Sequence, residues 1–400
     1  MKKILPTLIL LAPYKFTKYH YNHYELDFFE NKIDKNFEIH DLSLILNPQS
    51  EFIFKNKRHK RVKVFLSVKE WLNYFNKINN EPDKLVVFNL LDISSFNSIL
   101  IHFILKKNKN KIIQLKSPGI PNIHNESKKV KIDLSKKKLK FLQTKYLFYS
   151  LKNKLFKFLI KFILFDEIYY LVRGNKINFK IELNSRKKKF IKYHSHDFSR
   201  LKLINKYKKK ESIGVFLDAP DPYFEDDFSL FGLKFNYDKL TWYNNLNKFL
   251  NDVEKVYSTK IIIIPHPKVK GFRNPYYNKN FKVNHDIDAI YKLIPKSKVV
   301  ISMSASTAIS VAIACGKRLI LTYNNQIIKA NNSLYNSTRF VGRKCDANLI
   351  NIDSYDKKKI IKKVNKDKYN NYLYNYITSK KILKKKNYEI LNEILKDLKK

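Results

Sequence analysis

A histidine held between two prolines follows the apolar run at residues 261 to 264. Proline fixes φ near about −65° and has no N–H to donate to a sheet, so Pro265 and Pro267 end a strand and present His266 on a rigid turn. A histidine there can donate to a phosphate oxygen, or bind it as a cation if the phosphate raises its pKa. A single histidine can also be a packing residue, so this turn indicates an anion contact only together with other polar groups.

Hydroxyl side chains gather after a second apolar run, at 298 to 302. Ser304, Ser306 and Thr307 precede a stretch of small residues that predicts a helix at 306 to 315, which Gly316 ends. Hydroxyls and unpaired backbone N–H groups at the amino end of a helix can hold a phosphate, and the helix dipole favours negative charge there. Capping without a ligand is the alternative, and it is commoner for one serine than for three hydroxyls.

Three aspartates are candidates for a general base, the group that removes a proton from an attacking hydroxyl. Asp218 comes directly after a third apolar run and Asp221 follows in the same proline-containing loop, whereas Asp197 lies in the sequence HSHDF. His194 and His196 stand beside Asp197, so we expect these two histidines at the same cleft. A solvated polar loop is the alternative for HSHDF.

Apolar runs that alternate with amphipathic stretches predict an α/β chain with parallel sheets. In the second half, the pattern predicts strands at 213 to 217, 260 to 264, 298 to 302 and 318 to 322, and helices at 238 to 256, 286 to 294 and 306 to 315. Ligands bind at the carboxyl ends of the strands of such sheets. We therefore expect the polar groups that follow the strands of this half to meet in one site.

The length of 400 residues fits two domains, and a lysine-dense stretch near residue 208 separates the halves. We expect an amino-terminal acceptor-side α/β domain at 1–207 and a carboxyl-terminal, Rossmann-like nucleotide-sugar-binding domain at 208–400, which ends in an amphipathic helix. The apolar start of the chain resembles a signal peptide, but Pro6 and Pro13 interrupt it and favour a buried first strand.

The segment at 139–172 is apolar, aromatic and rich in lysine. A helix there would place five large apolar side chains on one face with lysines beside it: Leu151, Leu155, Phe158, Leu159 and Phe162. Such a helix can lie flat on anionic lipid, or it can be a core helix whose lysines reach solvent. The sequence leaves both interpretations open.

The net charge of +45 suggests a polyanionic partner, but only nine of the 80 basic residues are arginine and the lysines are spread along the chain. Proteins that bind nucleic acid rely on arginine for bidentate contacts, so we expect no nucleic-acid partner. Attraction to the inner face of the cytoplasmic membrane requires only lysine charge. No uncharged apolar stretch reaches the roughly 18 residues of a membrane span, which predicts a cytoplasmic or peripherally bound protein.

Ordinary cofactor and metal motifs are missing from the sequence. Cys315 and Cys345 have no metal-binding spacing, and the seven glycines form neither GxGxxG nor a P-loop. A phosphate site in this chain must therefore use hydroxyls and helix ends. We expect no cofactor and no metal.

Four motifs in order, HSHDF, VFLDAPDPYF, IIPHPK and ISMSASTAISVAIACGKRLI, resemble bacterial surface-polysaccharide biosynthesis proteins over residues 194 to 322. The histidine-proline pair, followed about forty residues later by the hydroxyl cluster, is similar to sialyltransferases and polysialyltransferases of GT-B fold and to related capsule and lipooligosaccharide glycosyltransferases. The resemblance implies two Rossmann-like domains around a cleft.

The resemblance also implies roles for residues. His266, with the adjacent Pro267, and the hydroxyls of Ser304, Ser306 and Thr307 would hold the phosphate of a nucleotide-sugar donor, such as a CMP-linked sialic-acid-like sugar. In that family a glycine follows the acidic pair that supplies the base, whereas here APDP follows Asp218. Asp218, Asp221 and Asp197 therefore all remain candidates.

The mechanism expected from these residues is inverting transfer to a glycan or lipid-linked glycan, without a metal ion. Transfer of Kdo or of a polyol phosphate would use similar phosphate contacts. A non-catalytic protein that binds a nucleotide sugar or a glycan is the alternative of another class, and the altered acidic motif favours it.

Overall fold

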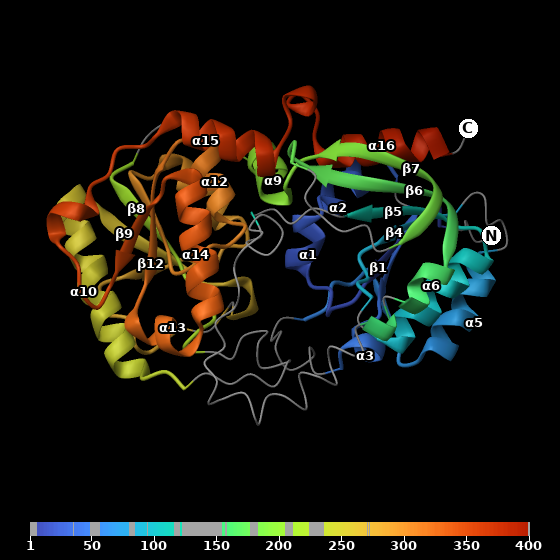
Figure 1. Ribbon diagram of the computed structural model, residues 1–400, viewed down its shortest axis with the longest axis horizontal. Helices are drawn as coiled ribbons and strands as arrows, with labels where there is room; N and C mark the ends of the chain where they lie inside the picture. The colour runs from blue at the N-terminus through green and yellow to red at the C-terminus, as the bar shows by residue number, and fades with distance from the viewer. Residues whose placement is uncertain are drawn as a thin grey trace.

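The computed structural model shows two parallel α/β sheets side by side (Figure 1). It describes residues 6–34, 36–48, 57–79, 85–93, 95–115, 121, 154–156, 158–176, 183–204, 211–223, 236–269, 271 and 273–398. The α/β class and the parallel sheets predicted from the sequence are confirmed.

The first sheet has the strand order β3-β2-β1-β4-β5-β6-β7, and all its pairs are parallel. Its strands are β1 (Leu8–Ala12), β2 (Phe37–Asp41), β3 (Val62–Val64), β4 (Val86–Asn89), β5 (Lys111–Leu115), β6 (Leu164–Arg173) and β7 (Asn184–Tyr193). The helices of this half are α1 (Lys18–His23), α2 (Leu26–Lys32), α3 (Ser43–Leu46), α5 (Val68–Ile78) and α6 (Phe96–Lys107). The apolar run at the start of the chain is the buried strand β1, as predicted.

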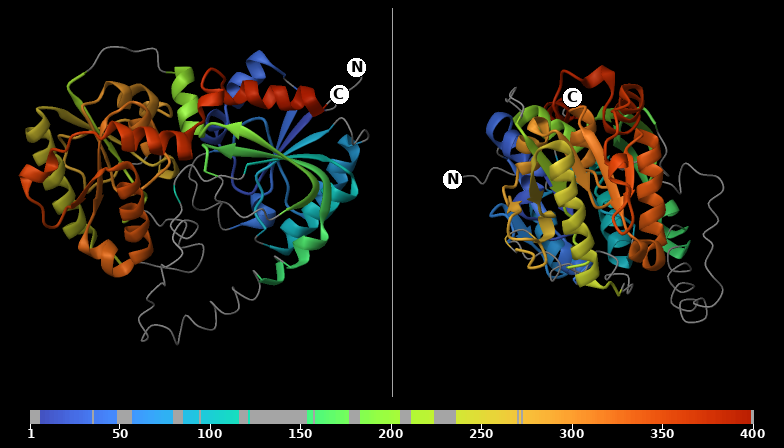
Figure 2. Two further views of the ribbon diagram at one scale, coloured as in Figure 1. Left: turned by 45° about the horizontal axis from the view of Figure 1, so that its top comes forward. Right: turned by 90° about the vertical axis from the view of Figure 1, so that its left-hand side faces the viewer.

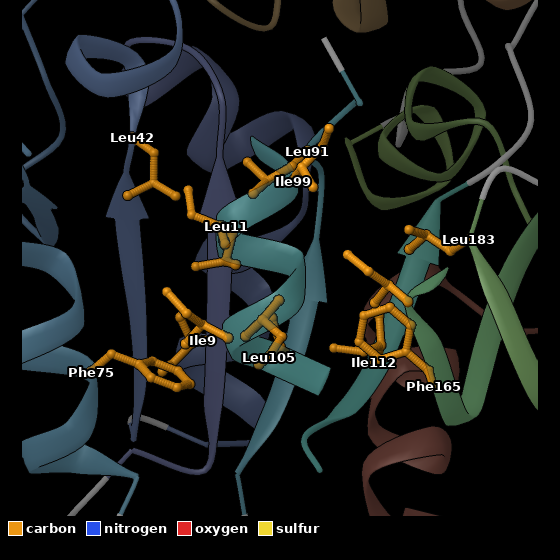
Figure 3. Close-up of a cluster of buried hydrophobic side chains, with 14 of the residues drawn as sticks. Ile9, Leu11, Leu42, Phe75, Leu91, Ile99, Leu105, Ile112, Phe165 and Leu183 are labelled. Atoms are coloured by element: carbon orange, nitrogen blue, oxygen red, sulfur yellow. The ribbon is translucent and has the colours of Figure 1, made fainter. Parts of the chain in front are cut away.

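Strand β1 is apolar on both faces because helices cover both faces of a parallel sheet. Ile9 and Leu11 pack in a cluster with Phe75 of α5 and Leu105 of α6 (Figure 3), whereas Leu8 and Leu10 pack in a separate cluster on the opposite face. Alternate residues of a strand point to opposite faces, which explains this division. The carboxyl ends of β1 and its neighbours are thereby fixed in place.

The second sheet has the order β10-β9-β8-β11-β12-β13 and is also parallel. Its strands are β8 (Ile213–Leu217), β9 (Lys260–Ile264), β10 (Lys282–Val283), β11 (Val299–Ser302), β12 (Arg318–Tyr323) and β13 (Asn348–Asn351). Its helices are α10 (Lys239–Tyr257), α11 (Ala289–Leu293), α12 (Ile309–Ala314), α13 (Asn325–Ala330), α14 (Asn332–Cys345) and α15 (Lys366–Tyr372). The four predicted strands and three predicted helices of this half are present, and β10 and β13 are additional strands.

Short 3-10 helices complete the description, together with the π-helix η7: η2 (Ile160–Phe162), η4 (Pro267–Val269), η5 (Ile294–Lys296), η6 (Lys357–Ile360), η7 (Leu373–Ile377) and η8 (Lys380–Ile382). The strand order reverses between β8 and β11, because β9 and β10 extend the sheet on one side and β12 and β13 on the other. Ligands of open α/β sheets bind outside the carboxyl ends of the strands at such a reversal.

Two helices connect the domains. Helix α9 (His196–Ile204) lies between the two sheets, and α16 (Asn387–Leu398) returns from the second half to lie along the first domain (Figures 1 and 2). Ile390, Leu391 and Ile394 of α16 are buried in the same cluster as Leu8 and Leu10. The division at residue 208 assigns α16 to the second half of the sequence, but its apolar face belongs to the core of the first domain.

The segment at 139–172 is not one helix. Residues up to 153 lie outside the described part of the chain, residues 154–162 are helical where they are described, and the rest is mainly strand β6. Ile168, Tyr170 and Val172 of β6 are buried on one face of the sheet and Tyr169 and Leu171 on the other. This near-continuous apolar run is typical of a parallel strand buried on both faces, so the expected helix is wrong for residues 164 to 172.

Candidate active site

A cavity of about 210 Å³ lies at the reversal point of the second sheet. Its walls come from the carboxyl ends of β8, β9, β10 and β11, together with Tyr19 of α1 and Asp197 of α9. It contains most of the predicted site residues: Asp197, Asp218, His266, Pro267, Ser304, Ser306 and Thr307. The tertiary structure therefore brings together polar residues from six separate parts of the chain.

Asp218 is the first residue after β8, and its backbone N–H donates to the carbonyl of Ile264 at the end of β9 (3.0 Å). Its Oδ1 is buried and has no hydrogen-bond partner among the described residues. Burial raises the pKa of this carboxyl to about 7, although interactions with the Tyr277 side chain and the backbone of Ala219 oppose the shift. A carboxylate with a pKa near neutrality is suited to accept and release a proton.

His266 follows β9 on the turn that its two prolines define. Strand β9 ends at Ile264, η4 begins at Pro267, and the N–H of Val269 donates to the carbonyl of His266 (2.9 Å). Both His266 and Pro267 line the cavity. The rigid, non-helical presentation of this histidine is as predicted.

The hydroxyl cluster lies in a turn before α12. The helix begins at Ile309 and not at 306, because the N–H groups of Ile309 and Ser310 donate three residues back, to the carbonyls of Ser306 (3.3 Å) and Thr307 (3.0 Å). Within the described chain, the backbone N–H groups of Ser306, Thr307 and Ala308 donate to no protein group. Two hydroxyls and these N–H groups remain available to an anion.

The other end of α12 is closed as the sequence predicts. Gly316 has φ +61°, and its N–H donates to the carbonyl of Ile313 (3.0 Å) while that of Lys317 donates to Ala312 (2.9 Å). These two bonds make a Schellman motif. On the sheet side, the hydroxyl of Ser302 donates to the carbonyl of Ser304 (2.7 Å), so both ends of the turn are held.

Asp197 lies on α9 and reaches the cavity from the side of the first domain. The hydroxyl of Tyr291 donates to its Oδ1 (2.9 Å), and Nδ1 of His23 lies 3.8 Å from the same oxygen. Tyr19 stacks on His23 with ring centroids 5.3 Å apart and also lines the cavity. The carboxylates of Asp197 and Asp218 therefore face one cavity from different elements.

Three predicted residues do not line this cavity. His194 is buried: its Nε2 donates to the carbonyl of Lys385 (2.9 Å) and its Nδ1 lies 2.6 Å from the Thr378 hydroxyl. His196 is buried against the rings of His23 and Tyr24. His194, just before α9, and His196, its first residue, therefore pack against the interior and do not face the cleft.

Asp221 is the third residue absent from the cavity lining, and the cis Asp221–Pro222 bond follows it. Glu225, Asp226 and Asp227, which follow Pro222 in the sequence, lie outside the described residues. Of the three candidate bases, the cavity therefore contains Asp218 and Asp197.

Four polar lining residues away from the predicted strand ends were not identified from the sequence: Tyr19 of α1, and Asn284, His285 and Asp286, which follow β10. Strand β10 has only two residues, too few for a visible apolar run, so nothing marked the polar loop after it as a strand end. Tyr19 belongs to the other half of the chain, and only the packing of α1 against α9 brings it to the cavity.

The cavity lining is acidic in a strongly basic chain. Its described residues include Asp197, Asp218 and Asp286 but no lysine or arginine.

Among the described residues, no three histidine, cysteine, aspartate or glutamate side chains come together in a way that could hold a metal ion. None of the described helices is long and apolar enough to cross a bilayer.

Comparison with solved structures identifies the fold. The wall teichoic acid polymerase TagF superposes with a TM-score of 0.53 over 98% of this chain and 89% of that chain, at 12% sequence identity. The calicheamicin glycosyltransferase CalG4 superposes with a TM-score of 0.50 over 100% of this chain and 98% of that chain, at 10% identity. The chain has the GT-B fold.

The GT-B-like arrangement of two Rossmann-like domains predicted from the sequence is confirmed. No protein-family model and no curated protein sequence matches the chain. In the GT-B arrangement seen here, α16 crosses back to the first domain and α9 lies at the junction (Figure 2). At identities of 10% and 12%, the likeness establishes the fold and not the reaction.

Proposed function

We propose that the chain is an inverting, metal-independent glycosyltransferase that uses a nucleotide-sugar donor bound in the cavity at the ends of β8, β9 and β11. The observation that carries this proposal is the convergence of Asp218, His266 and the hydroxyls of Ser306 and Thr307 on one cavity. A base, an anion contact and a set of hydrogen-bond donors are the parts that such a transfer requires.

In the proposed reaction, Asp218 removes the proton of the acceptor hydroxyl as that oxygen attacks the anomeric carbon. The bond from this carbon to the donor phosphate breaks, and the electron pair leaves with the phosphate. His266, the hydroxyls of Ser306 and Thr307 and the N–H groups of that turn stabilise the departing phosphate. Asp197, which already accepts from Tyr291, is assigned to orientation of the acceptor.

The charge of the lining favours a donor with a single phosphate. Three carboxylates and no described lysine or arginine line the cavity, so the second phosphate of a nucleoside diphosphate would find no permanently charged cation among the described lining residues. A CMP-linked sugar carries less phosphate charge than a CDP- or UDP-linked one. We therefore propose a CMP-linked donor. As the acceptor we propose a glycan of a surface polysaccharide, at the inner face of the cytoplasmic membrane.

Nucleotide-dependent thermal stabilisation tests the donor. Purified wild type, His266→Ala and Asp218→Asn are melted with CMP, CDP, UDP, GDP or ADP, and His59→Ala, a histidine outside the cavity lining, is the control. A ligand at 100 times its Kd adds about 2.7 kcal/mol of stability. We expect CMP to stabilise wild type, Asp218→Asn and the control, but not His266→Ala.

Other outcomes separate the alternatives. Stabilisation by CDP in place of CMP would favour transfer of a polyol phosphate, the alternative for which the likeness to a wall teichoic acid polymerase gives a reason. Binding of CMP without turnover by the wild type would favour a non-catalytic binding protein. If no nucleotide stabilises the wild type, the proposed function is wrong.

A further inference from the structure

Four large apolar side chains lie exposed at one corner of the first domain. Leu155, Phe158, Phe162 and Leu164 are 54%, 55%, 68% and 41% exposed, and the Phe158 and Phe162 rings touch only edge to face, with centroids 5.1 Å apart. They stand on the helical stretch before β6 and on the first residue of that strand. We call these four residues the apolar patch.

The exposure of the patch is not a failure of packing. Phe156, Ile160 and Ile163 of the same stretch are buried in the first core, together with Phe165 of β6. The stretch is therefore anchored by one face, while its other face presents rings to solvent. Contiguous exposed apolar groups on a well-packed element mark a site of interaction.

Exposed basic side chains lie on the same stretch as the apolar patch and on the neighbouring strand. Lys154 and Lys161 flank it on the helical stretch, and Arg186 and Lys188 are exposed on one face of the neighbouring strand β7. The two parts adjoin, because Leu164 pairs with Asn184 and the side chain of Asn184 donates to the carbonyl of Lys161 (3.1 Å). Among the described residues here, Asp166 is the exposed carboxylate and lies 3.8 Å from Arg186, so positive charge prevails.

We propose that the apolar patch, with these basic residues, docks on the surface of an anionic lipid bilayer. Exposed phenylalanine and leucine side chains enter the boundary between headgroups and acyl chains, and lysine and arginine pair with the anionic headgroups. Binding to an anionic bilayer uses both the exposed apolar side chains and the basic residues. A second copy of the chain is disfavoured as the occupant, because the same patch would place like charges opposite one another.

The position of the patch leaves the cavity open. The patch lies at the amino end of β6, whereas Arg173 ends that strand on the side of Asp197 and the cleft. A ten-residue strand is about 33 Å long, so a bilayer at one end does not cover the other. The docking surface stands independently of the proposed reaction, and donor-dependent stabilisation does not depend on it.

Vesicle co-sedimentation of the full chain tests the proposal. The probes are vesicles of phosphatidylcholine alone and of equal parts phosphatidylcholine and phosphatidylglycerol. We expect wild type to bind the anionic vesicles and not the neutral ones. Phe158→Ser with Phe162→Ser should lower binding by about tenfold or more, since each ring loses its transfer into the interface. The melting temperature should be unchanged, because both rings are exposed.

Matched controls separate the patch from general surface properties. Leu240→Ser with Ile361→Ser removes two side chains of the second half that are 62% and 56% exposed, and should not change vesicle binding. Arg186→Glu with Lys188→Glu should abolish the preference for anionic vesicles, whereas Lys358→Glu with Lys359→Glu, an equal change of net charge, should not.

Three results would overturn the proposal. In the first, the wild type binds neither kind of vesicle. In the second, the double phenylalanine substitution lowers vesicle binding no more than the Leu240 and Ile361 control does. In the third, the wild type is an oligomer that the phenylalanine substitutions dissociate. The last would show that a second copy of the chain covers the patch.

Discussion

At the scale of single residues, the burial of Asp218 serves the proposed reaction and also lowers the stability of the fold. A carboxyl that is buried with an unpartnered oxygen holds its proton up to about pH 7, which is useful for proton transfer but destabilises the fold when the group ionises. The folded-state pKa of Asp218, about 7, lies above the value of 3.8 for an unperturbed aspartate. The stability linked to this proton is therefore fully present below about pH 3.8 and is lost as pH rises from there through about 7.

We predict that Asp218→Asn abolishes turnover and raises the melting temperature at about pH 8. The amide cannot ionise, so the variant avoids a desolvation cost that amounts to about 1.4 kcal/mol for each unit of pKa shift, as an upper bound. At about pH 3 the carboxyl is protonated in both the folded and the unfolded wild type, and the difference should largely vanish. Thermal unfolding at the two pH values measures this.

Glu25 supplies the control for Asp218. Burial raises the pKa of its carboxyl to about 7 as well, but it lies outside the cavity lining and accepts from the N–H of Tyr388 at the start of α16 (3.1 Å). Glu25→Gln should show the same pH-dependent gain in melting temperature and keep its turnover. Equal loss of turnover in both variants would contradict the assignment of Asp218 as the base.

At the scale of elements, two glycines with the same backbone conformation meet different surroundings. Gly174, after β6, and Gly316, after α12, both have φ +61°. A Cβ on Gly174 would lie 2.2 Å from the backbone oxygen of Asn375, whereas nothing lies within 4 Å of a Cβ on Gly316. The turn after β6 is thus pressed against the segment that leads from α15 towards α16.

We predict that Gly316→Ala costs about 1 kcal/mol and Gly174→Ala about 3 kcal/mol or more. Both variants pay for a left-handed residue with a side chain, but only Gly174→Ala also forces two backbone segments apart. Urea unfolding measures both free energies. Equal costs would mean that the close approach of residues 174 and 375 can relax without penalty.

At the scale of the whole molecule, Arg200 of α9 joins the two domains. Its Nη1 donates to Asp27 of α2 (2.6 Å), and its Nε and Nη2 donate to Asp288, before α11 (3.2 and 3.3 Å). The Arg200 side chain is 5% exposed, so both contacts are largely shielded from water. Asp288 follows the loop of Asp286 that lines the cavity, so this contact also fixes one wall of the site.

We predict that Arg200→Met destabilises the protein by about 3 kcal/mol, because two partly buried carboxylates lose their cation. Adding Asp27→Asn and Asp288→Asn should recover part of this loss, which chemical unfolding can measure. Lys385→Met, which breaks an exposed pair with Glu393, is the control and should cost less than about 1 kcal/mol. A similar cost for both single variants would show that Arg200 does not hold the domains together.

Local signals in the sequence were sufficient for much of the second domain. The strands at 213 to 217 and 260 to 264 are apolar runs bounded by polar residues or proline, and β8 and β9 have these same bounds. The turn of His266 follows from its prolines and the end of α12 from Gly316, because each depends on φ at one or two residues. Strand β6 was not separable from a helix by pattern, because a strand buried on both faces has no alternation.

The sequence by itself determined the α/β class, the order of elements around His266 and the hydroxyl cluster, and the absence of a P-loop or dinucleotide motif. Only the tertiary structure decided that Asp197 reaches the cavity while His194 and His196 face the interior, that Tyr19 and Asp286 join the lining, and that α16 belongs to the first core. The physical reason is range: φ preferences and hydrophobic period act within a few residues, whereas the burial that raises the pKa of Asp218 and selects cavity residues depends on segments far apart in the chain.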